Sequence, residues 1–251
     1  MLERFGLGDL GIEDFPEATF ALSAIMVAVF LFTRTNIDYF ENIFGFIPLH
    51  PQIYAFITYT FIHVDFTHIF FNVLFLLIAG IAIEQTLGKW VFLAIYFSSG
   101  NIAVIFDILG RFLSGISFSV PFVGASGAIF GVLAVAAFIK PMEKSPIIFA
   151  LLALVPLAQW TISSIPGLGL TSQVDLLVTV AIVMAAMMLV FLLPGSVPVF
   201  LTMVMFLLSW MVIILLRLPT AVSNLGHLGG VVGGIASFFI FAKKSEDRKK
   251  T

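Results

Sequence analysis

Residues 176–216 read LLVTVAIVMAAMMLVFLLPGSVPVFLTMVMFLLSWMVIILL, a run of 41 residues without a single charge. A helix of about 20 mostly apolar residues crosses the hydrocarbon core of a bilayer, so this run is long enough for two such helices. Pro194 and Gly195, followed by Pro198, favour a turn near its middle. The stretch therefore predicts a transmembrane hairpin, and with it a helical membrane protein.

The composition of the whole chain agrees with this prediction. Of 251 residues, 61% are apolar and 10% are charged, whereas a soluble domain has roughly 45–50% apolar and about 25% charged residues. The net charge of −2 leaves no basic surface for nucleic acid, and the lack of cysteine excludes disulfides, thiolate metal sites and thiol nucleophiles. We expect an all-α, polytopic bundle that forms one transmembrane domain over residues 1–251.

Eight apolar stretches are candidate membrane spans: residues 18–33, 66–83, 90–106, 124–139, 146–164, 176–193, 198–216 and 226–242. Eight spans place both tails, residues 1–17 and 243–251, on one side. If that side is the cytoplasm, nine Lys and Arg residues face it and three face the outside, Arg34, Arg111 and Arg217, as the positive-inside rule requires. The acidic start of the chain is unlike the basic start of a signal peptide, so we expect the first span to be retained.

Several polar side chains that remain inside the spans share one depth. Counting about 1.5 Å per residue from charges at the inner edge, such as Glu84 and Lys140, puts them about 6–12 Å below the outer surface of a core about 30 Å thick. Polar groups are costly at that depth, so they are candidates for function. They come from three predicted helices and are His68, Asn72, Ser126 and His227.

Small residues surround the serine and one of the histidines. His227 lies among glycines at 226, 229, 230, 233 and 234, while Gly127 and Gly131 follow Ser126. Such spacing lets helix backbones approach closely, so a serine and a histidine could reach the roughly 2.6–3.2 Å separation of a nucleophile and its base. The span that starts at residue 124 is also short, which places its unpaired first amide N–H groups inside the membrane, where they could form an oxyanion hole.

Each of these residues also has a purely structural explanation. Ser126 resembles the packing serines of Gly- and Ala-rich membrane helices, and His227 resembles a histidine that links two helices. His68 and Asn72, one helical turn apart, could tie their helix to another.

Other charged or polar residues fall near the ends of the predicted spans. We expect His63 and Asp65 at the outer interface, where snorkelling or a local hydrogen bond accounts for them. Asp107 and Asp175 are expected to be solvated.

The chain resembles the rhomboid intramembrane serine proteases. The resemblance covers about residues 55–140 and 220–242. It is carried by Phe61-Ile62-His63 with His68 and Asn72, by Glu84 with Gly88, by Gly124-Ala125-Ser126-Gly127, and by Gly226-His227 with Gly230 and Gly234.

The resemblance implies a six-helix core and a Ser–His dyad. Ser126 would attack the scissile carbonyl and His227 would act as its base, while His68, Asn72 and the Ser126 N–H would hold the oxyanion. An aromatic at Phe130 would pack on the catalytic imidazole. No metal or other cofactor is implied. The implied partners are membrane lipid and membrane proteins cut within or beside a transmembrane helix, and the expected location is the plasma membrane.

Two features depart from the family pattern. Tyr54-Ala55 stands where many members carry Trp-Arg, which affects the bracing of that loop. Three predicted spans separate the serine and histidine helices where the common core has one, so we expect an inserted hairpin within residues 165–217 or one re-entrant segment.

Two other function classes stay open from the sequence. A catalytically inactive relative that binds transmembrane helices would keep the same fold, and intramembrane His and Asp residues also occur in transporters of protons or small solutes. The sequence predicts no oligomeric state.

Overall fold

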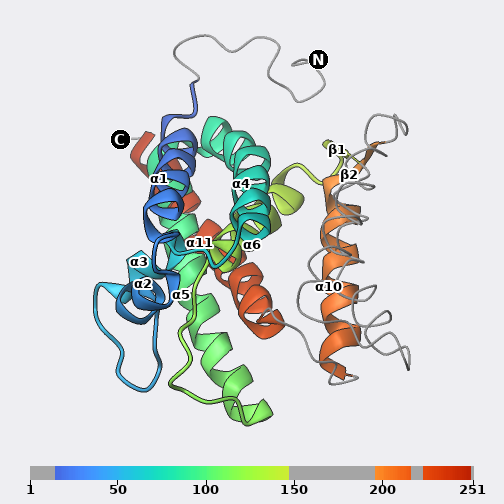
Figure 1. Cartoon of the computed structure of the whole chain (residues 1–251). Helices are drawn as coiled ribbons and strands as arrows, with labels where there is room; N and C mark the ends of the chain where they lie inside the picture. Colours follow the sequence, from blue (N-terminus) through green and yellow to red (C-terminus); the bar gives the residue numbers. More distant parts are fainter. Residues whose placement is uncertain (1–14, 147–195, 216–222, 250–251) are drawn as a thin grey trace. The chain divides into compact units, whose positions relative to one another are not determined.

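The computed structural model describes residues 15–146, 196–215 and 223–249. These residues are mostly helical (Figure 1). They belong to two compact units, one formed by residues 1–136 with 225–251 and the other by residues 137–224. Each unit is described by itself.

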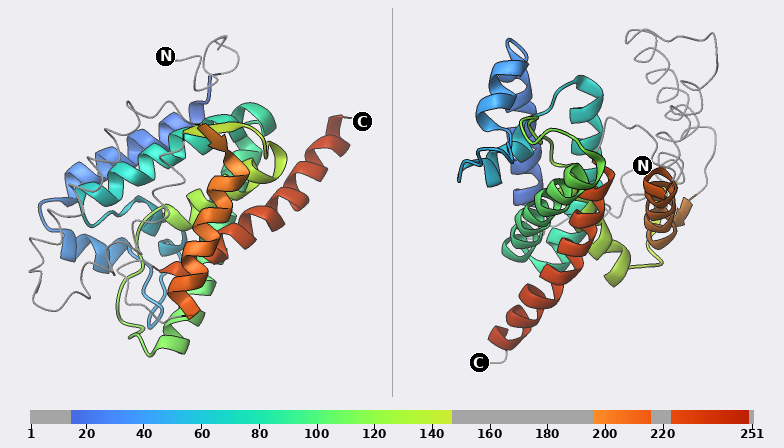
Figure 2. Two further views of the ribbon diagram at one scale, coloured as in Figure 1. Left: turned by 90° about the vertical axis from the view of Figure 1, so that its right-hand side faces the viewer. Right: turned by 90° about the horizontal axis from the view of Figure 1, so that it is seen from below.

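The first unit contains nearly all of the residues that carry the resemblance. Its elements are α1 (Glu17–Thr33), α2 (Ile37–Phe44), α3 (Ala55–Thr58), the 3₁₀ turn η3 (Tyr59–Phe61), α4 (Phe66–Leu87), α5 (Lys89–Ser114), most of α6 (Ser126–Ile139) and nearly all of α11 (Asn224–Lys249). Figure 2 shows α11 as one uninterrupted helix.

Six of the eight predicted spans correspond to helices. Among the described residues, α4, α5 and the 224–241 part of α11 are long and apolar enough to cross a membrane, while α1, α6 and α10 (Val199–Leu215) are shorter apolar helices. The predicted span at 176–193, and all of the one at 146–164 except Pro146, lie outside the described residues.

The helix ends follow local sequence signals. Asp65 precedes α4, and its side chain accepts a hydrogen bond from the His68 backbone N–H, which satisfies one unpaired donor of the first turn. Gly88 separates α4 from α5 with φ +82°. Gly115 ends α5 in the left-handed conformation, with φ +67°.

A buried carboxylate joins α1 to α4. Glu84, only 6% exposed, accepts hydrogen bonds from the Ala18 and Thr19 backbone N–H groups and from the Thr19 hydroxyl at 2.7–2.9 Å. The first amide N–H groups of a helix have no partner within it, and a negative charge favours the positive end of the helix dipole. Glu84 therefore caps α1 from another helix, and Figures 1 and 2 show the two helices side by side.

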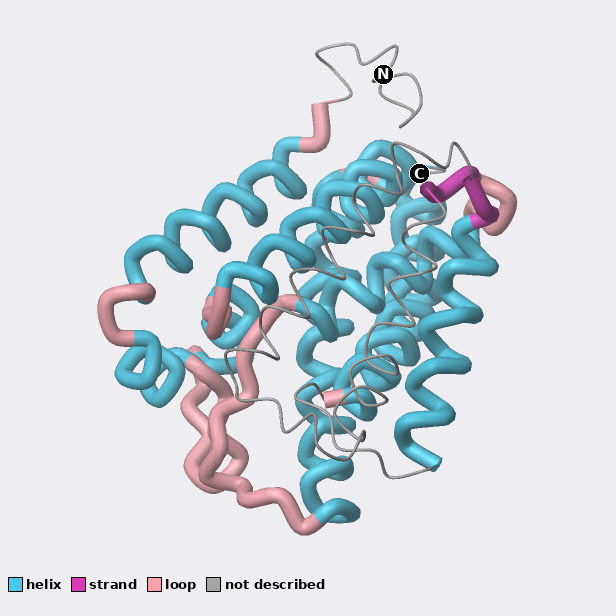
Figure 3. Tube along the Cα trace, turned by 45° about the vertical axis from the view of Figure 1, so that its right-hand side comes forward, coloured by secondary structure: helices cyan, strands magenta, loops and turns pink. Residues whose placement is uncertain are grey.

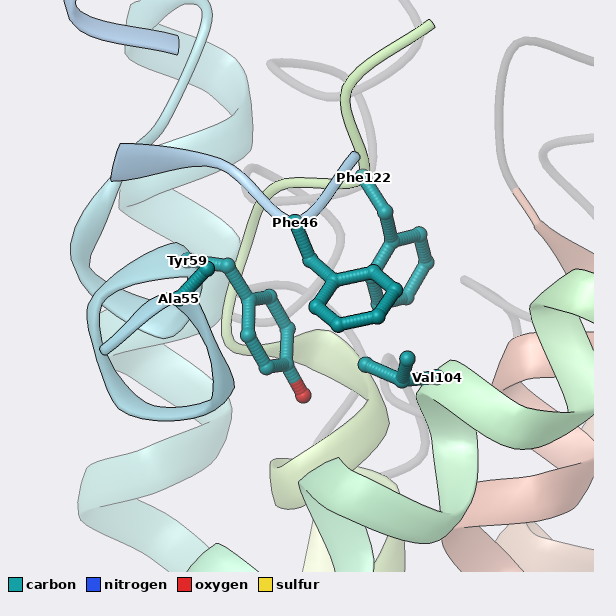
Figure 4. Packing of buried hydrophobic residues seen from close by; sticks show 5 residues of the cluster. All are labelled: Phe46, Ala55, Tyr59, Val104 and Phe122. Atoms are coloured by element: carbon teal, nitrogen blue, oxygen red, sulfur yellow. The ribbon is translucent and has the colours of Figure 1, made fainter. Parts of the chain in front are cut away.

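A small aromatic cluster links two loops to α5. The α2–α3 loop (residues 45–54) and the α5–α6 loop (residues 115–125) run together, with backbone hydrogen bonds in both directions between Phe46 and Phe122 and one from Leu49 N–H to the Phe118 carbonyl (Figure 3). Beneath them, the buried residues of the cluster pack against one another (Figure 4): Phe46, Ala55, Tyr59, Val104 and Phe122.

The second unit contains a short two-stranded sheet. Strand β1 (Lys144–Pro146) pairs in antiparallel register with β2 (Ser196–Pro198), so that Ser145 lies opposite Val197. Helix α10 starts directly after Pro198, as the turn signal near that proline predicts. The predicted turn at Pro194 and Gly195 lies outside the described residues.

Candidate active site

Ser126 is the first residue of α6. Two residues before it lies Gly124, which no other residue could replace without strain. Gly124 has φ +104°, a conformation that L side chains rarely adopt. A Cβ atom at this position would lie 2.5 Å from His68 Nε2, so the imidazole occupies the space that a side chain would need. The absence of a side chain at residue 124 brings the backbone before the serine against His68.

The start of α6 leaves backbone donors beside the serine hydroxyl. The first backbone hydrogen bond of the helix runs from Ile129 N–H to the Ala125 carbonyl, so the amides of Ser126, Gly127 and Ala128 precede the helical ladder. Ser126 is partly exposed, whereas its neighbours Ala125 and Gly127 are buried. A partly exposed serine therefore lies beside amide N–H groups that have no helical acceptor.

His227 lies in the first turn of α11, and its side chain meets the serine. His227 Nε2 is 2.8 Å from Ser126 Oγ, and the histidine is only 8% exposed. The ring of Phe130, one turn beyond Ser126, lies 4.8 Å from the imidazole centroid at an angle of 51°. The structure thus brings together the serine, the histidine and the aromatic that the sequence analysis singled out.

Glycine pairs set the separation of α6 and α11. A Cβ atom at Gly230 would overlap the carbonyl of Gly127, and one at Gly234 would overlap the carbonyl of Gly131. The two backbones are therefore closer than any side chain would allow. This close packing holds the N-terminal ends of the two helices within reach of one Ser–His hydrogen bond.

His68 and Asn72 lie one turn apart near the start of α4. Asn72 is 5% exposed, and its side-chain amide donates to the His68 carbonyl at 2.8 Å. This bond uses one of the two amide hydrogens, and the buried Asn72 Oδ1 has no hydrogen-bond partner among the described residues. The His68 ring reaches the backbone at Gly124, two residues before Ser126.

His63 is part of this arrangement, although the sequence predicts it at the outer membrane interface. It has the local hydrogen bond expected there, from Nδ1 to the Phe61 carbonyl at 3.2 Å, but its side chain is fully buried. Its ring meets the His68 ring at a centroid distance of 4.9 Å, edge to face. Because four residues and the start of a helix separate the two histidines, helical spacing gave no signal of this contact.

The expectation that Asp107 is solvated is wrong. Helix α5 continues to Ser114, eight residues beyond the predicted span, and Asp107 is 5% exposed within it. Its carboxylate accepts from Nε of Arg111, which is also buried and which donates through Nη1 to the Ser117 and Val120 carbonyls. Arg111, predicted to be an outward-facing loop charge, is instead a buried helix residue that binds the α5–α6 loop.

The assembled groups are those of acyl transfer by a serine. A hydroxyl lies within hydrogen-bond distance of an imidazole that can take its proton. The amide N–H groups at the start of α6 and the side chains of His68 and Asn72 on α4 are hydrogen-bond donors. Such donors can stabilise the negative charge that develops on a carbonyl oxygen during the reaction. Among the described residues, no group of three or more His, Asp or Glu side chains is placed to hold a metal ion.

Comparison with known proteins adds an independent observation. A family model described as Rhomboid domain matches residues 50–196, more than half of the chain. The matched region contains His68, Asn72 and Ser126, whereas His227 lies beyond its end. No curated protein matches the chain.

Proposed function

The chain belongs to the rhomboid family, and from that premise we propose that it is an active intramembrane serine endopeptidase that cleaves transmembrane segments of membrane proteins. Members of this family are usually intramembrane serine proteases, and the apolar helices agree with an integral membrane protein. The observation that carries the proposal is the 2.8 Å contact between Ser126 Oγ and His227 Nε2.

His227 acts first as a base and then as an acid. Nε2 accepts the proton of the Ser126 hydroxyl as Oγ attacks the carbonyl carbon of the scissile bond. The imidazolium then gives this proton to the leaving amine, and the C–N bond breaks to leave an ester between Ser126 and the new carboxyl end of the substrate. Water, deprotonated in the same way, attacks the ester, and the released Oγ recovers a proton from His227.

The negative charge that develops on the carbonyl oxygen is stabilised by hydrogen-bond donors that are already in position. The Ser126 backbone N–H at the start of α6 supplies one. The His68 imidazole beside Gly124 and the second amide hydrogen of Asn72 supply two more. Fixed donors need little rearrangement during the reaction, and one such donor is worth about 10²–10³-fold in rate in other serine proteases.

Phe130 limits the positions open to the catalytic ring. Its ring covers one side of the His227 imidazole, while Ser126 approaches at Nε2. A side chain with few open rotamers loses little entropy on reaching the productive geometry.

The depth predicted for the site favours substrates that span the membrane. A peptide bond in an intact helix is shielded by its own turn, so a segment must unwind before Oγ can reach its carbonyl. Segments with small or helix-breaking residues unwind at lower cost. We propose such segments as substrates, the plasma membrane as the location and residues 1–251 as one rhomboid-like domain, with no cofactor required.

The test uses the full chain reconstituted in lipid with a panel of single-span membrane proteins. Wild type is expected to cleave at least one of them, Ser126→Ala none, and Ser114→Ala, which changes an exposed serine at the end of α5, at the wild-type rate. Equal cleavage by wild type and Ser126→Ala would overturn the assignment. Binding of the panel without cleavage by folded wild type would favour the inactive helix-binding protein instead.

A further inference from the structure

The buried ion pair of Asp107 and Arg111 binds the α5–α6 loop, which precedes Ser126. Arg111 makes three hydrogen bonds in the last turns of α5: Nε to Asp107 at 2.5 Å, and Nη1 to the Ser117 and Val120 carbonyls at 3.0 and 2.9 Å. Both side chains of the pair are less than a tenth exposed. Two charges at such a site are costly unless they are paired and hydrogen-bonded. Here the guanidinium binds the loop through its Nη1 donors.

The bonds of Arg111 complete a series of anchors along the α5–α6 loop. After Gly115 ends the helix, the carbonyls of Ser117 and Val120 bind Arg111, and that of Phe118 binds Leu49 of the α2–α3 loop. The Phe46–Phe122 backbone pair follows. The loop is therefore fixed from α5 on one side and from the α2–α3 loop on the other.

The last anchor lies two residues before the nucleophile. Gly124 N–H donates to the Tyr59 carbonyl at 2.9 Å, and the same glycine is in contact with the His68 ring. Val120 is only six residues before Ser126. A displacement of the loop at Val120 would be transmitted through Phe122 and Gly124 to the serine and its backbone N–H.

We propose that Asp107 and Arg111 are a positioning pair that fixes the α5–α6 loop, so that the Ser126 N–H and His68 converge on one oxyanion. The pair acts through the loop and does not touch substrate. This proposal rests on the proposed function, because the geometry it maintains is that of the Ser–His site.

The residue types fit this role. A guanidinium presents donors in a rigid planar fork, so one group can bind a carboxylate and two carbonyls at once. A lysine at 111 would keep the charge but would not reproduce this geometry. The spacing of four residues places Asp107 on the same face of α5, where it compensates the buried charge without a second helix.

The test compares single and double variants. Arg111→Met leaves the Asp107 carboxylate buried and unpaired, which threatens the fold. The double variant Asp107→Leu with Arg111→Met removes both charges at similar volume, so it keeps the fold while losing the loop bonds. Arg111→Lys is the conservative variant. Arg34→Met is the matched control, because Arg34 is exposed and only covers the Phe30 ring.

The first readout is the rate at which a fluorophosphonate labels Ser126 in folded, reconstituted protein. The double variant is expected to be labelled about 10-fold more slowly than wild type, Arg111→Lys to be intermediate, and Arg34→Met to be unchanged, because small misplacements of reacting groups have large effects on rate. With a cleavable substrate, kcat should fall while KM stays the same. Wild-type labelling rates in the folded double variant would overturn the proposal.

The second readout is amide hydrogen exchange in residues 116–124, which does not depend on activity. The double variant is expected to exchange faster there, and α4 and α11 to be unchanged. If wild type is not labelled, the proposed function fails, and unchanged loop exchange in the double variant would then overturn the positioning role separately.

Discussion

Glu84 and His68 lie near opposite ends of α4, and the polar groups around them are satisfied to very different degrees. The Glu84 carboxylate accepts three hydrogen bonds from the start of α1. Around His68, the buried atoms His63 Nε2 and Asn72 Oδ1 have no hydrogen-bond partner among the described residues.

This difference distinguishes a structural contact between helices from a functional site. A fully paired polar network makes a rigid connection between helices. Buried polar atoms that the protein leaves unpaired are costly, and they persist where a substrate or water is to be bound. Substitutions at the Glu84 end should therefore change stability, and those at the His68 end should change activity.

The largest effect on activity is expected from His227→Ala. Without the imidazole, Ser126 has no base at 2.8 Å, so the rate of fluorophosphonate labelling should fall by about 10³-fold or more. The protein should stay folded, and His50→Ala, which removes an exposed histidine from the α2–α3 loop, should be labelled like wild type. A labelling rate within about tenfold of wild type would exclude His227 as the base.

Glu84→Ala should show the opposite behaviour. Removing the carboxylate leaves the Ala18 and Thr19 donors unpaired at the end of α1, and the free energy of unfolding should fall by about 3 kcal/mol. Denaturant titration in detergent measures this change, with Glu17→Gln, which breaks only the exposed pair with Lys89, as the control. Labelling per folded molecule should be unchanged, and a large loss would mean that the two ends of α4 are not separable.

Gly230→Ala tests the spacing of α6 and α11. The added methyl group would overlap the Gly127 carbonyl, so the two backbones must move apart and lengthen the Ser–His contact. We expect a loss of about 2 kcal/mol in stability together with a clear drop in labelling, whereas Val232→Ala on an exposed face of α11 should have little effect. An unchanged labelling rate would show that the glycine contact does not set the geometry of the dyad.

Asn72→Ala should have the smallest effect of the four. Losing one oxyanion donor is expected to slow turnover of a cleavable substrate by about tenfold, which is less than the roughly 10²–10³-fold effect of single donors in other serine proteases, because His68 and the Ser126 N–H remain. Asn42→Ala is a close control, because the Asn42 amide also donates to the carbonyl four residues before it, but on α2. Equal kcat values for wild type and Asn72→Ala would assign Asn72 to structure alone.

Much of the fold follows from uncharged runs in the sequence. The helices at 17–33, 66–87 and 126–139 begin or end close to their predicted limits, because their ends carry strong signals such as Asp65 and Gly124. The approach of Ser126 and His227 was also predictable, since glycine spacing on both helices permits close packing.

One contact that the sequence did not predict, the Asp107–Arg111 pair, depends on charges that neutralise each other. Asp107 looked like the end of a span because a lone carboxylate is costly in lipid. Its pairing with Arg111 removes that cost and lets α5 continue to Ser114. The spacing of four residues was a usable signal. The contact of His63 with His68 had none, because it depends on the path of the chain between η3 and α4.

The most direct test of the central claim is to identify the residue that a fluorophosphonate modifies in the folded, reconstituted chain. Peptide mass spectrometry of wild type should find the label on Ser126, and the label should be absent from Ser126→Ala but retained in Ser114→Ala. Folded wild type that remains unlabelled, or that carries the label equally after Ser126→Ala, would contradict the assignment of Ser126 and His227 as a catalytic dyad.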